Sequence, residues 1–207
     1  MDSDRTEPSL VEWGFAMRAF SDQADSGDGY LVEACPGGVL VAVIDGLGHG
    51  PQAAEVAKVT VAALQGHVHE PVDLLVKRCH RGLRGTRGAV MSLAAFSARD
   101  GEMTWVGVGN VTGLLLRADQ KAERPRETLL SRGGVVGYNL PSLYPVVHSV
   151  YPGDVLVFAT DGLRSSFTDD VTLDDSPQQT ADRLLETYCR GTDDALVLIA
   201  RYVGEKV

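Results

Sequence analysis

The feature that most constrains this chain is a short apolar run that ends at an acidic residue and a cluster of glycines. Six consecutive apolar residues, Val39 to Ile44, are followed by Asp45-Gly46-Leu47-Gly48-His49-Gly50. The run is rich in β-branched side chains and too short to span a membrane, so it predicts a strand buried on both faces. The glycines permit a sharp turn and leave space beside the carboxylate. We therefore expect an acidic group at a rigid strand end.

The same arrangement recurs further along the chain. The apolar segment Asp154 to Thr160 ends in Asp161-Gly162, and the pair Asp193-Asp194 directly precedes the apolar run Ala195 to Ala200. An isolated Asp-Gly is most simply a hairpin turn, but repeated acidic sites at strand ends favour one shared centre. Carboxylate and carbonyl oxygens are the ligands that hard divalent cations prefer. The pattern therefore predicts a metal site.

A fourth acidic residue extends this set. Asp28 follows a segment rich in Ser, Asp and Gly and comes just before the apolar Tyr30-Leu31-Val32, which predicts the start of another strand. Asp28 is therefore a further candidate ligand.

Length, charge and cysteine content set the broad class. The 207 residues contain no linker-like segment, so we expect a single domain over 1–207, with the polar residues 1–8 frayed. A net charge of -9 disfavours binding to nucleic acid or to an anionic membrane. No segment is typical of a signal peptide or a bilayer span. The three cysteines lack the spacing of a disulfide framework or zinc site. We expect a cytoplasmic monomer.

Periodicity predicts about three helices among eight or more strands. The helices begin at Pro51, Pro71 and Pro177, the last with Ser176 as its N-cap. Because strands and helices do not alternate, an α+β fold is expected, with two sheets packed face to face and helices outside. We expect strands over 11–20, 89–96, 103–109, 111–117, 145–151 and 154–160, with hairpin turns at 100–101 and 152–153 and an irregular surface excursion over 118–128.

Two charged segments stand apart from this framework. The basic stretch Lys77 to Arg87 is typical of a solvated helix face, although it is also suited to a phosphorylated or acidic partner. The acidic residues of 169–175, behind Asp161, indicate a mobile flap or solvated loop. They lack EF-hand spacing, which argues against a calcium-binding structural protein.

The order of the acidic motifs resembles that of the PPM metal-dependent serine/threonine protein phosphatases. The match runs from Gly27-Asp28-Gly29-Tyr30 through Asp45-Gly46 and Asp161-Gly162 to Asp193-Asp194. It is closest to the compact bacterial branch that includes SpoIIE, RsbU and RsbX, and within it to RsbX. The resemblance implies an αββα sandwich of two antiparallel sheets with a metal cleft at one edge.

The resemblance also implies roles for individual residues. Asp45 would bridge two manganese or magnesium ions, with the Gly46 carbonyl on one of them. Asp28 would complete the second site, and Asp161 and Asp193 the first. Asp193 is preferred over Asp194, which falls where relatives often carry Asn. Asp45 and Asp161 would thereby be the catalytic residues.

Two departures from the family pattern and one open role remain. The only arginine near the first acidic motif, Arg18, is not in the context of the arginine that grips phosphate in many eukaryotic members. The motif that can hold a third metal ends in Gly109-Asn110 instead of Gly-Asp. Histidine as a residue type is suited to general acid catalysis, so His49 is a candidate to protonate a leaving alkoxide, but it can equally be a capping or substrate-side residue. No substrate-binding residue is assigned.

By resemblance, the expected activity is removal of phosphate from phosphoserine or phosphothreonine. The expected partners are STAS-domain proteins of the RsbS and RsbR type, so that the enzyme would reset stressosome signalling. One alternative is a phosphatase of an anti-sigma-factor antagonist, like RsbU or SpoIIE. Another is a pseudophosphatase that binds phosphoprotein without hydrolysis, against which the presence of all four carboxylates counts.

Overall fold

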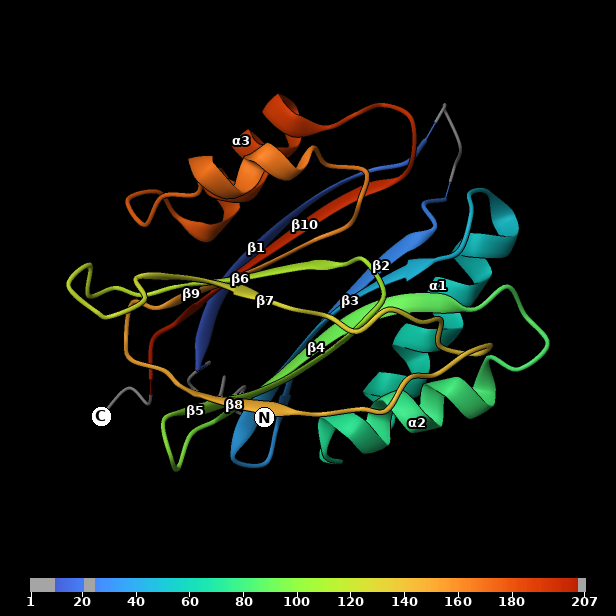
Figure 1. Ribbon diagram of the computed structural model, residues 1–207, viewed down its shortest axis with the longest axis horizontal. Helices are drawn as coiled ribbons and strands as arrows, with labels where there is room; N and C mark the ends of the chain where they lie inside the picture. Colours follow the sequence, from blue (N-terminus) through green and yellow to red (C-terminus); the bar gives the residue numbers. More distant parts are fainter. Residues whose placement is uncertain (1–9, 21–24, 205–207) are drawn as a thin grey trace, which may run out of the picture.

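Two five-stranded antiparallel sheets packed face to face form the centre of the computed structural model, which describes residues 10–20 and 25–204. The strand orders are β1-β10-β9-β6-β7 and β2-β3-β4-β5-β8. Helix α3 lies on the outer face of the first sheet, and α1 and α2 cover the second (Figure 1). This arrangement confirms the expected α+β sandwich. The residues expected to be frayed, 1–8, lie outside the described ranges.

Strands and helices do not alternate along the chain. They are β1 (Val11–Arg18), β2 (Asp28–Cys35), β3 (Gly38–Gly46), α1 (Pro51–Gln65), α2 (Val72–Gly82), β4 (Ala89–Ser97), β5 (Glu102–Val108), β6 (Thr112–Leu116), β7 (Arg126–Leu129), β8 (Val146–Ser149), β9 (Val155–Ala159), the 3-10 helix η1 (Ser165–Asp170), α3 (Pro177–Tyr188) and β10 (Ala195–Tyr202). None of the described helices is long and apolar enough to cross a bilayer.

Strand β3 shows why the sequence carries an uninterrupted apolar run. Its odd-numbered side chains face the other sheet, and its even-numbered ones face α1 and α2; the two sets are Val39, Val41 and Val43, and Leu40, Ala42 and Ile44. Side chains alternate between the faces of a strand, so both faces of β3 must be apolar. Asp45 continues the odd-numbered set and therefore belongs to the side between the sheets, where the strand ends.

The predicted starts of α1 and α3 are confirmed, and α2 begins one residue later than predicted. Pro51 is the first residue of α1, and Ser176 caps α3 through a capping box with Gln179. Pro71 is the N-cap of α2 and lies just before its first residue. Helix α3 packs very tightly on β1, because a Cβ at Gly14 would lie 2.4 Å from the Cα of Gln178.

The predicted hairpin across Pro152-Gly153 is wrong. Strand β8 pairs with β5 in one sheet, and β9 lies between β10 and β6 in the other. The Pro-Gly turn, with Gly153 at φ 96°, carries the chain from one sheet to the other. A turn suited to a hairpin is equally suited to a crossing between sheets, and apolar content alone cannot separate the two. The turn at Asp100-Gly101 does join paired strands, β4 and β5.

Two surface segments are more ordered than their composition indicates. The excursion expected to be irregular ends in β7, a short edge strand paired with β6. Part of the acidic segment behind Asp161 forms η1, and Asp170 and Asp175 both pair with Arg183 of α3. These ion pairs hold the segment against α3 and argue against a mobile flap.

Candidate metal centre

The predicted acidic residues meet at one edge of the sandwich. Asp28 begins β2 and Asp45 lies near the end of β3, and the two are direct partners across the antiparallel ladder. In the other sheet, Asp161 follows β9 and Asp193 precedes β10, which is antiparallel to β9, so both lie at the same end. Both sheets therefore deliver their carboxylates to one place.

The electrostatics of these carboxylates show how close they lie. Burial, followed by the charge of Asp45, raises the pKa of Asp28 to about 8. Burial, followed by the charges of Asp161, Asp193 and Asp194, raises the pKa of Asp45 to about 7. Burial disfavours an ionised carboxyl, and a second negative charge adds to the effect. A bound cation would reverse both contributions.

The oxygen ligands offered by these carboxylates fit a hard divalent cation, although the side chains do not surround one common position. Among the described residues, no three Asp, Glu, His or Cys side chains form a group that could hold an ion as they stand. Asp45 nevertheless interacts electrostatically with Asp28, Asp161 and Asp193, as the causes of the raised pKa values of Asp28 and Asp45 show. Asp161 is exposed and Asp193 half-buried, so both have room to turn inward.

Gly46 is closely enclosed at the centre of this edge. Its N–H donates to the carbonyl of Gly27 at 3.0 Å, and a Cβ at this position would lie 2.5 Å from the carbonyl oxygen of Ala53 in α1. Only glycine leaves space for this approach. The role of its carbonyl as a metal ligand stays a prediction.

Asp193 and Asp194 have different surroundings. The carboxylate of buried Asp194 accepts the N–H groups of Phe20 and Gly27, each at 2.9 Å and each on a separate oxygen. It thereby ties the start of β10 to the segments that flank β1 and β2. Asp193 accepts the N–H of Asp194 on Oδ1, and its other oxygen has no hydrogen bond within the described residues. This difference favours Asp193 as the ligand.

Two polar residues that orient the carboxylates were not among the predicted site residues. The hydroxyl of Thr160 donates to Asp28 at 2.8 Å, and the side-chain amide of Asn110 donates to Asp161 at 2.7 Å. Thr160 directly precedes the Asp161-Gly162 motif, and that adjacency is the only sequence signal for it. Asn110 is the residue at which the resemblance implies a third acidic ligand, and its amide is a hydrogen-bond donor to Asp161.

His49 lies on the exposed turn beside the centre. It stands between two glycines of positive φ, Gly48 at 84° and Gly50 at 85°, and its ring centroid is 5.4 Å from that of Phe20. No hydrogen bond to another described residue holds its ring. A role as proton donor stays a prediction.

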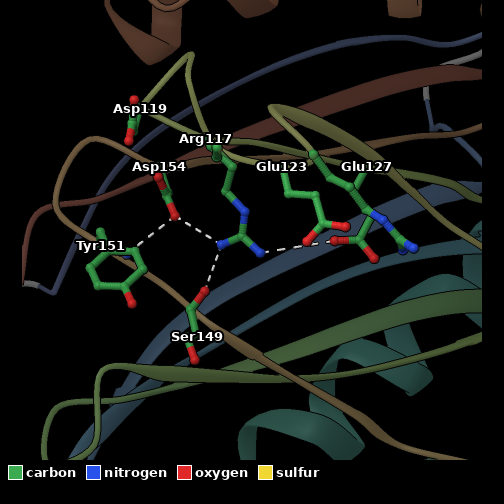
Figure 2. Close-up of a pocket in the computed structure, with 9 residues that line it drawn as sticks. Arg117, Asp119, Glu123, Glu127, Ser149, Tyr151 and Asp154 are labelled. Atoms are coloured by element: carbon green, nitrogen blue, oxygen red, sulfur yellow. Dashed lines mark hydrogen bonds and ion pairs between the residues drawn. The ribbon is translucent and has the colours of Figure 1, made fainter.

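A pocket of about 730 Å³ lies at the opposite end of the sandwich (Figure 2). One of its two arginines, Arg117, is bound to the buried carboxylate of Asp154 at 3.0 Å and to the carbonyl of Ser149. Asp154 precedes β9 and Asp161 follows it, a separation of roughly 20 Å along an extended strand. This pocket is larger than the one of about 390 Å³ that includes Asp28. It is nevertheless remote from the carboxylates of the candidate metal centre, and Arg117 is already paired with Asp154.

Known proteins resemble this chain along most of its length. Residues 36–203 match the family described as Stage II sporulation protein E (SpoIIE). Phosphoserine phosphatase RsbX of Bacillus subtilis (strain 168) is 26% identical over 141 residues, which cover 67% of this chain and 67% of RsbX.

Solved structures share the fold. One, described as "The bacterial stressosome: a modular system that has been adapted to control secondary messenger signaling", is 32% identical with a TM-score of 0.83, over 92% of this chain and 99% of that one. A crystal structure of RsbX in complex with magnesium has a TM-score of 0.82 at 19% identity, over 94% of this chain and 96% of that one. The chain therefore belongs to the SpoIIE family and is a phosphatase domain of the PPM type.

Proposed function

We propose that this chain removes phosphate from phosphoserine or phosphothreonine in proteins, using two manganese or magnesium ions. The observation that carries the proposal is the meeting of carboxylates from both sheets. Burial, followed by the charges of Asp161, Asp193 and Asp194 from the other sheet, raises the pKa of Asp45 to about 7. Similarity to a phosphoserine phosphatase, and the magnesium bound in a structure of RsbX, support it.

The placement of each carboxylate supports a set of ligands. Asp45 has Asp28 as its ladder partner and interacts with the charges of Asp161, Asp193 and Asp194 in the other sheet, which supports a bridging role between two ions. Asp28 and the Gly46 carbonyl would complete one site, and Asp161 and Asp193 the other. When bound, such a pair of ions lowers the pKa of a water molecule and offsets charge on phosphoryl oxygens.

The remaining groups of the chain prepare this centre. Thr160 and Asn110 hold one oxygen each of Asp28 and Asp161, which fixes the direction of the other lone pairs. Partners that orient metal ligands in this way commonly matter for affinity. Asp194 keeps the strand ends together through the backbone of Phe20 and Gly27.

The proposed substrates are phosphorylated STAS-domain proteins of the RsbS and RsbR type, met in the cytoplasm. The similarity to RsbX and to a structure described in connection with the bacterial stressosome supports this choice. Removal of their phosphates would reset stress signalling.

The test is release of phosphate from a phosphorylated STAS-domain protein, with manganese and with a chelator. We expect manganese-dependent turnover that Asp45→Asn and Asp161→Asn abolish. The matched control is Asp174→Asn, which removes an exposed carboxylate from the acidic segment that follows η1. Turnover of a generic phosphoester but not of the STAS-domain protein would support the phosphatase activity and reject the proposed substrate. Binding of phosphoprotein without turnover would establish a pseudophosphatase.

A further inference from the structure

The basic stretch that leads from α2 to β4 divides into paired and unpaired cations. Lys77 pairs with Asp73 at 2.7 Å, and Arg78 pairs with Glu70. The first pair lies within α2, and Glu70 of the second pair lies just before this helix. The cations that follow them, Arg81, Arg84 and Arg87, are exposed and have no ion pair or hydrogen bond to the rest of the described chain. Of these three, Arg87 lies beside the candidate metal centre.

Arg87 extends over the glycine turn of the candidate metal centre. Its Nη1 atom lies 2.7 Å from the position that a Cβ at Gly48 would take. Gly48 has φ 84°, a conformation that favours glycine, and its lack of a Cβ leaves open the space that the guanidinium occupies. A side chain at this position would displace Arg87.

The backbone holds Arg87 in register with this turn. The carbonyl of Gly88 accepts the N–H of Leu47 at 3.0 Å, and the N–H of Gly88 donates to the hydroxyl of Thr86 at 3.0 Å. Gly88 has φ 82°, and a Cβ there would lie 2.6 Å from the carbonyl oxygen of Val136. The start of the Arg87 side chain is therefore determined by contacts on both sides.

The turn that Arg87 covers adjoins the carboxylates. The carbonyl of Gly48 lies 3.4 Å from the Cβ position of Gly27, the residue before Asp28, and a Cβ at that position would lie 2.9 Å from a carboxylate oxygen of Asp194. A guanidinium over Gly48 is thus close to the edge where the ions would bind. It nevertheless forms no ion pair with any described carboxylate, so its hydrogen-bond donors remain available.

Arg18 does not share this position. It is the last residue of β1, and the even-numbered side chains of that strand, such as Ala16, face α3 on the outside of the sandwich. Phe15, an odd-numbered neighbour, packs between the sheets. Arg18 therefore belongs to the face turned away from the centre.

We propose that Arg87 binds the phosphoryl group of the substrate, a role that rests on the proposed phosphatase function. A guanidinium presents a planar fork of donors that matches two oxygens of a phosphate. Held over the rim of an acidic centre, it places positive charge where a phosphate approaches and would otherwise meet carboxylates. Arg87 thus supplies a phosphate-binding cation at the centre, a role that Arg18 does not fill.

The test compares Arg87→Gln with Arg84→Gln, a matched loss of an exposed arginine from the same segment. With a phosphoserine peptide and manganese, we expect Arg87→Gln to raise KM and the inhibition constant of inorganic phosphate about 10- to 100-fold, as for loss of charge-assisted hydrogen bonds. The value of kcat should change by less than about threefold. Arg87→Lys, which keeps the charge without the fork, should give an intermediate loss.

The outcomes separate this proposal from the phosphatase function. An unchanged inhibition constant for phosphate in Arg87→Gln, an equal loss in Arg84→Gln, or a loss found only in Arg18→Gln would overturn it. If the wild-type protein shows no turnover, the phosphatase proposal fails. Calorimetric titration of the manganese-loaded protein with inorganic phosphate then still tests Arg87, because it requires no reaction. Equal dissociation constants for wild type and Arg87→Gln would reject the role.

Discussion

The hydroxyl of Thr160, directly after β9, donates a 2.8 Å hydrogen bond to Oδ2 of Asp28, at the start of β2. The same hydroxyl oxygen accepts the N–H of Leu196 at 2.9 Å. One side chain therefore links the two sheets at the edge where the carboxylates meet. Its hydrogen bond also lowers the pKa of Asp28, against the larger effect of burial.

Replacing Thr160 by valine should weaken both the fold and the centre. The change leaves the N–H of Leu196 and an oxygen of Asp28 without their partner in a buried place, so we expect the free energy of unfolding to fall by about 1–3 kcal/mol. Manganese affinity should fall about tenfold, because Asp28 loses its orientation. Urea denaturation and metal titration measure the two effects. Thr160→Ser keeps the hydroxyl and should retain both properties; a valine variant equal to wild type would contradict the argument.

The stability of the metal-free protein should depend on pH in a direction set by Asp28 and Asp45. Their pKa values rise from an ordinary 3.8 to about 8 and about 7 in the folded protein. The folded state therefore retains protons that the unfolded chain releases above about pH 4, and this stabilisation is lost as pH rises through 7 and 8. With a chelator present, Tm should fall between about pH 5.5 and 8.5.

Manganese should raise Tm more at the alkaline end of this range, because the cation replaces the protons. Differential scanning calorimetry at several pH values measures both trends. Asp45→Asn removes one of the two groups and should flatten the decline in the chelated protein. A Tm that is independent of pH in wild type would show that these carboxyls titrate normally.

Asp193 and Asp194 should separate into a ligand and a structural residue. Asp193→Asn is expected to abolish the manganese-induced rise in Tm while changing metal-free stability by less than about 0.5 kcal/mol, as for most surface changes. Asp194→Ala removes the acceptor of two backbone N–H groups and should cost about 2–3 kcal/mol without metal. Loss of the metal response in Asp194→Ala, with its fold intact and with Asp193→Asn unaffected, would reverse the assignment.

Asn110→Asp should make the protein more dependent on metal. The amide of Asn110 donates to Asp161 at 2.7 Å, and a carboxylate in its place would repel Asp161 instead. We expect a lower Tm in chelator and a larger rise on adding manganese than in wild type. Asn110→Ala removes the hydrogen bond without adding charge and serves as the control. An equal manganese response in the two variants would show that the added charge does not contribute to metal binding.

The sequence predicts this centre to the extent that its information is local. Apolar runs that end in Asp-Gly place Asp45 and Asp161 at strand ends, and the antiparallel ladders then bring them to one edge. The contact of Thr160 with Asp28 joins residues 132 positions apart, and no nearby pattern marks it. From the sequence, Arg87 belongs to a basic stretch that is typical of a solvated helix face or suited to a phosphorylated or acidic partner. Its position over Gly48 depends on how a turn and a loop pack, which no local pattern predicts.

The wrong hairpin has the same origin. A Pro-Gly turn between two apolar segments satisfies the local rules of a hairpin, whereas the choice of sheet depends on partners elsewhere. Val146 of β8 pairs with Trp105, and Leu156 of β9 pairs with Ala200. Only these distant partners decide where each strand belongs.

The pairing of β1 with β10 has a consequence for how the protein is made. The two strands match along their full length, from Val11 with Tyr202 to Arg18 with Ala195. During synthesis β1 leaves the ribosome long before its partner exists, and Asp28 and Asp45 likewise precede Asp161 and Asp193. Chains that depend on such distant pairings fold slowly. A nascent chain therefore gains its full carboxylate centre only after β10 has been made, because Asp193 and the strand that follows it come after the other carboxylates in the chain.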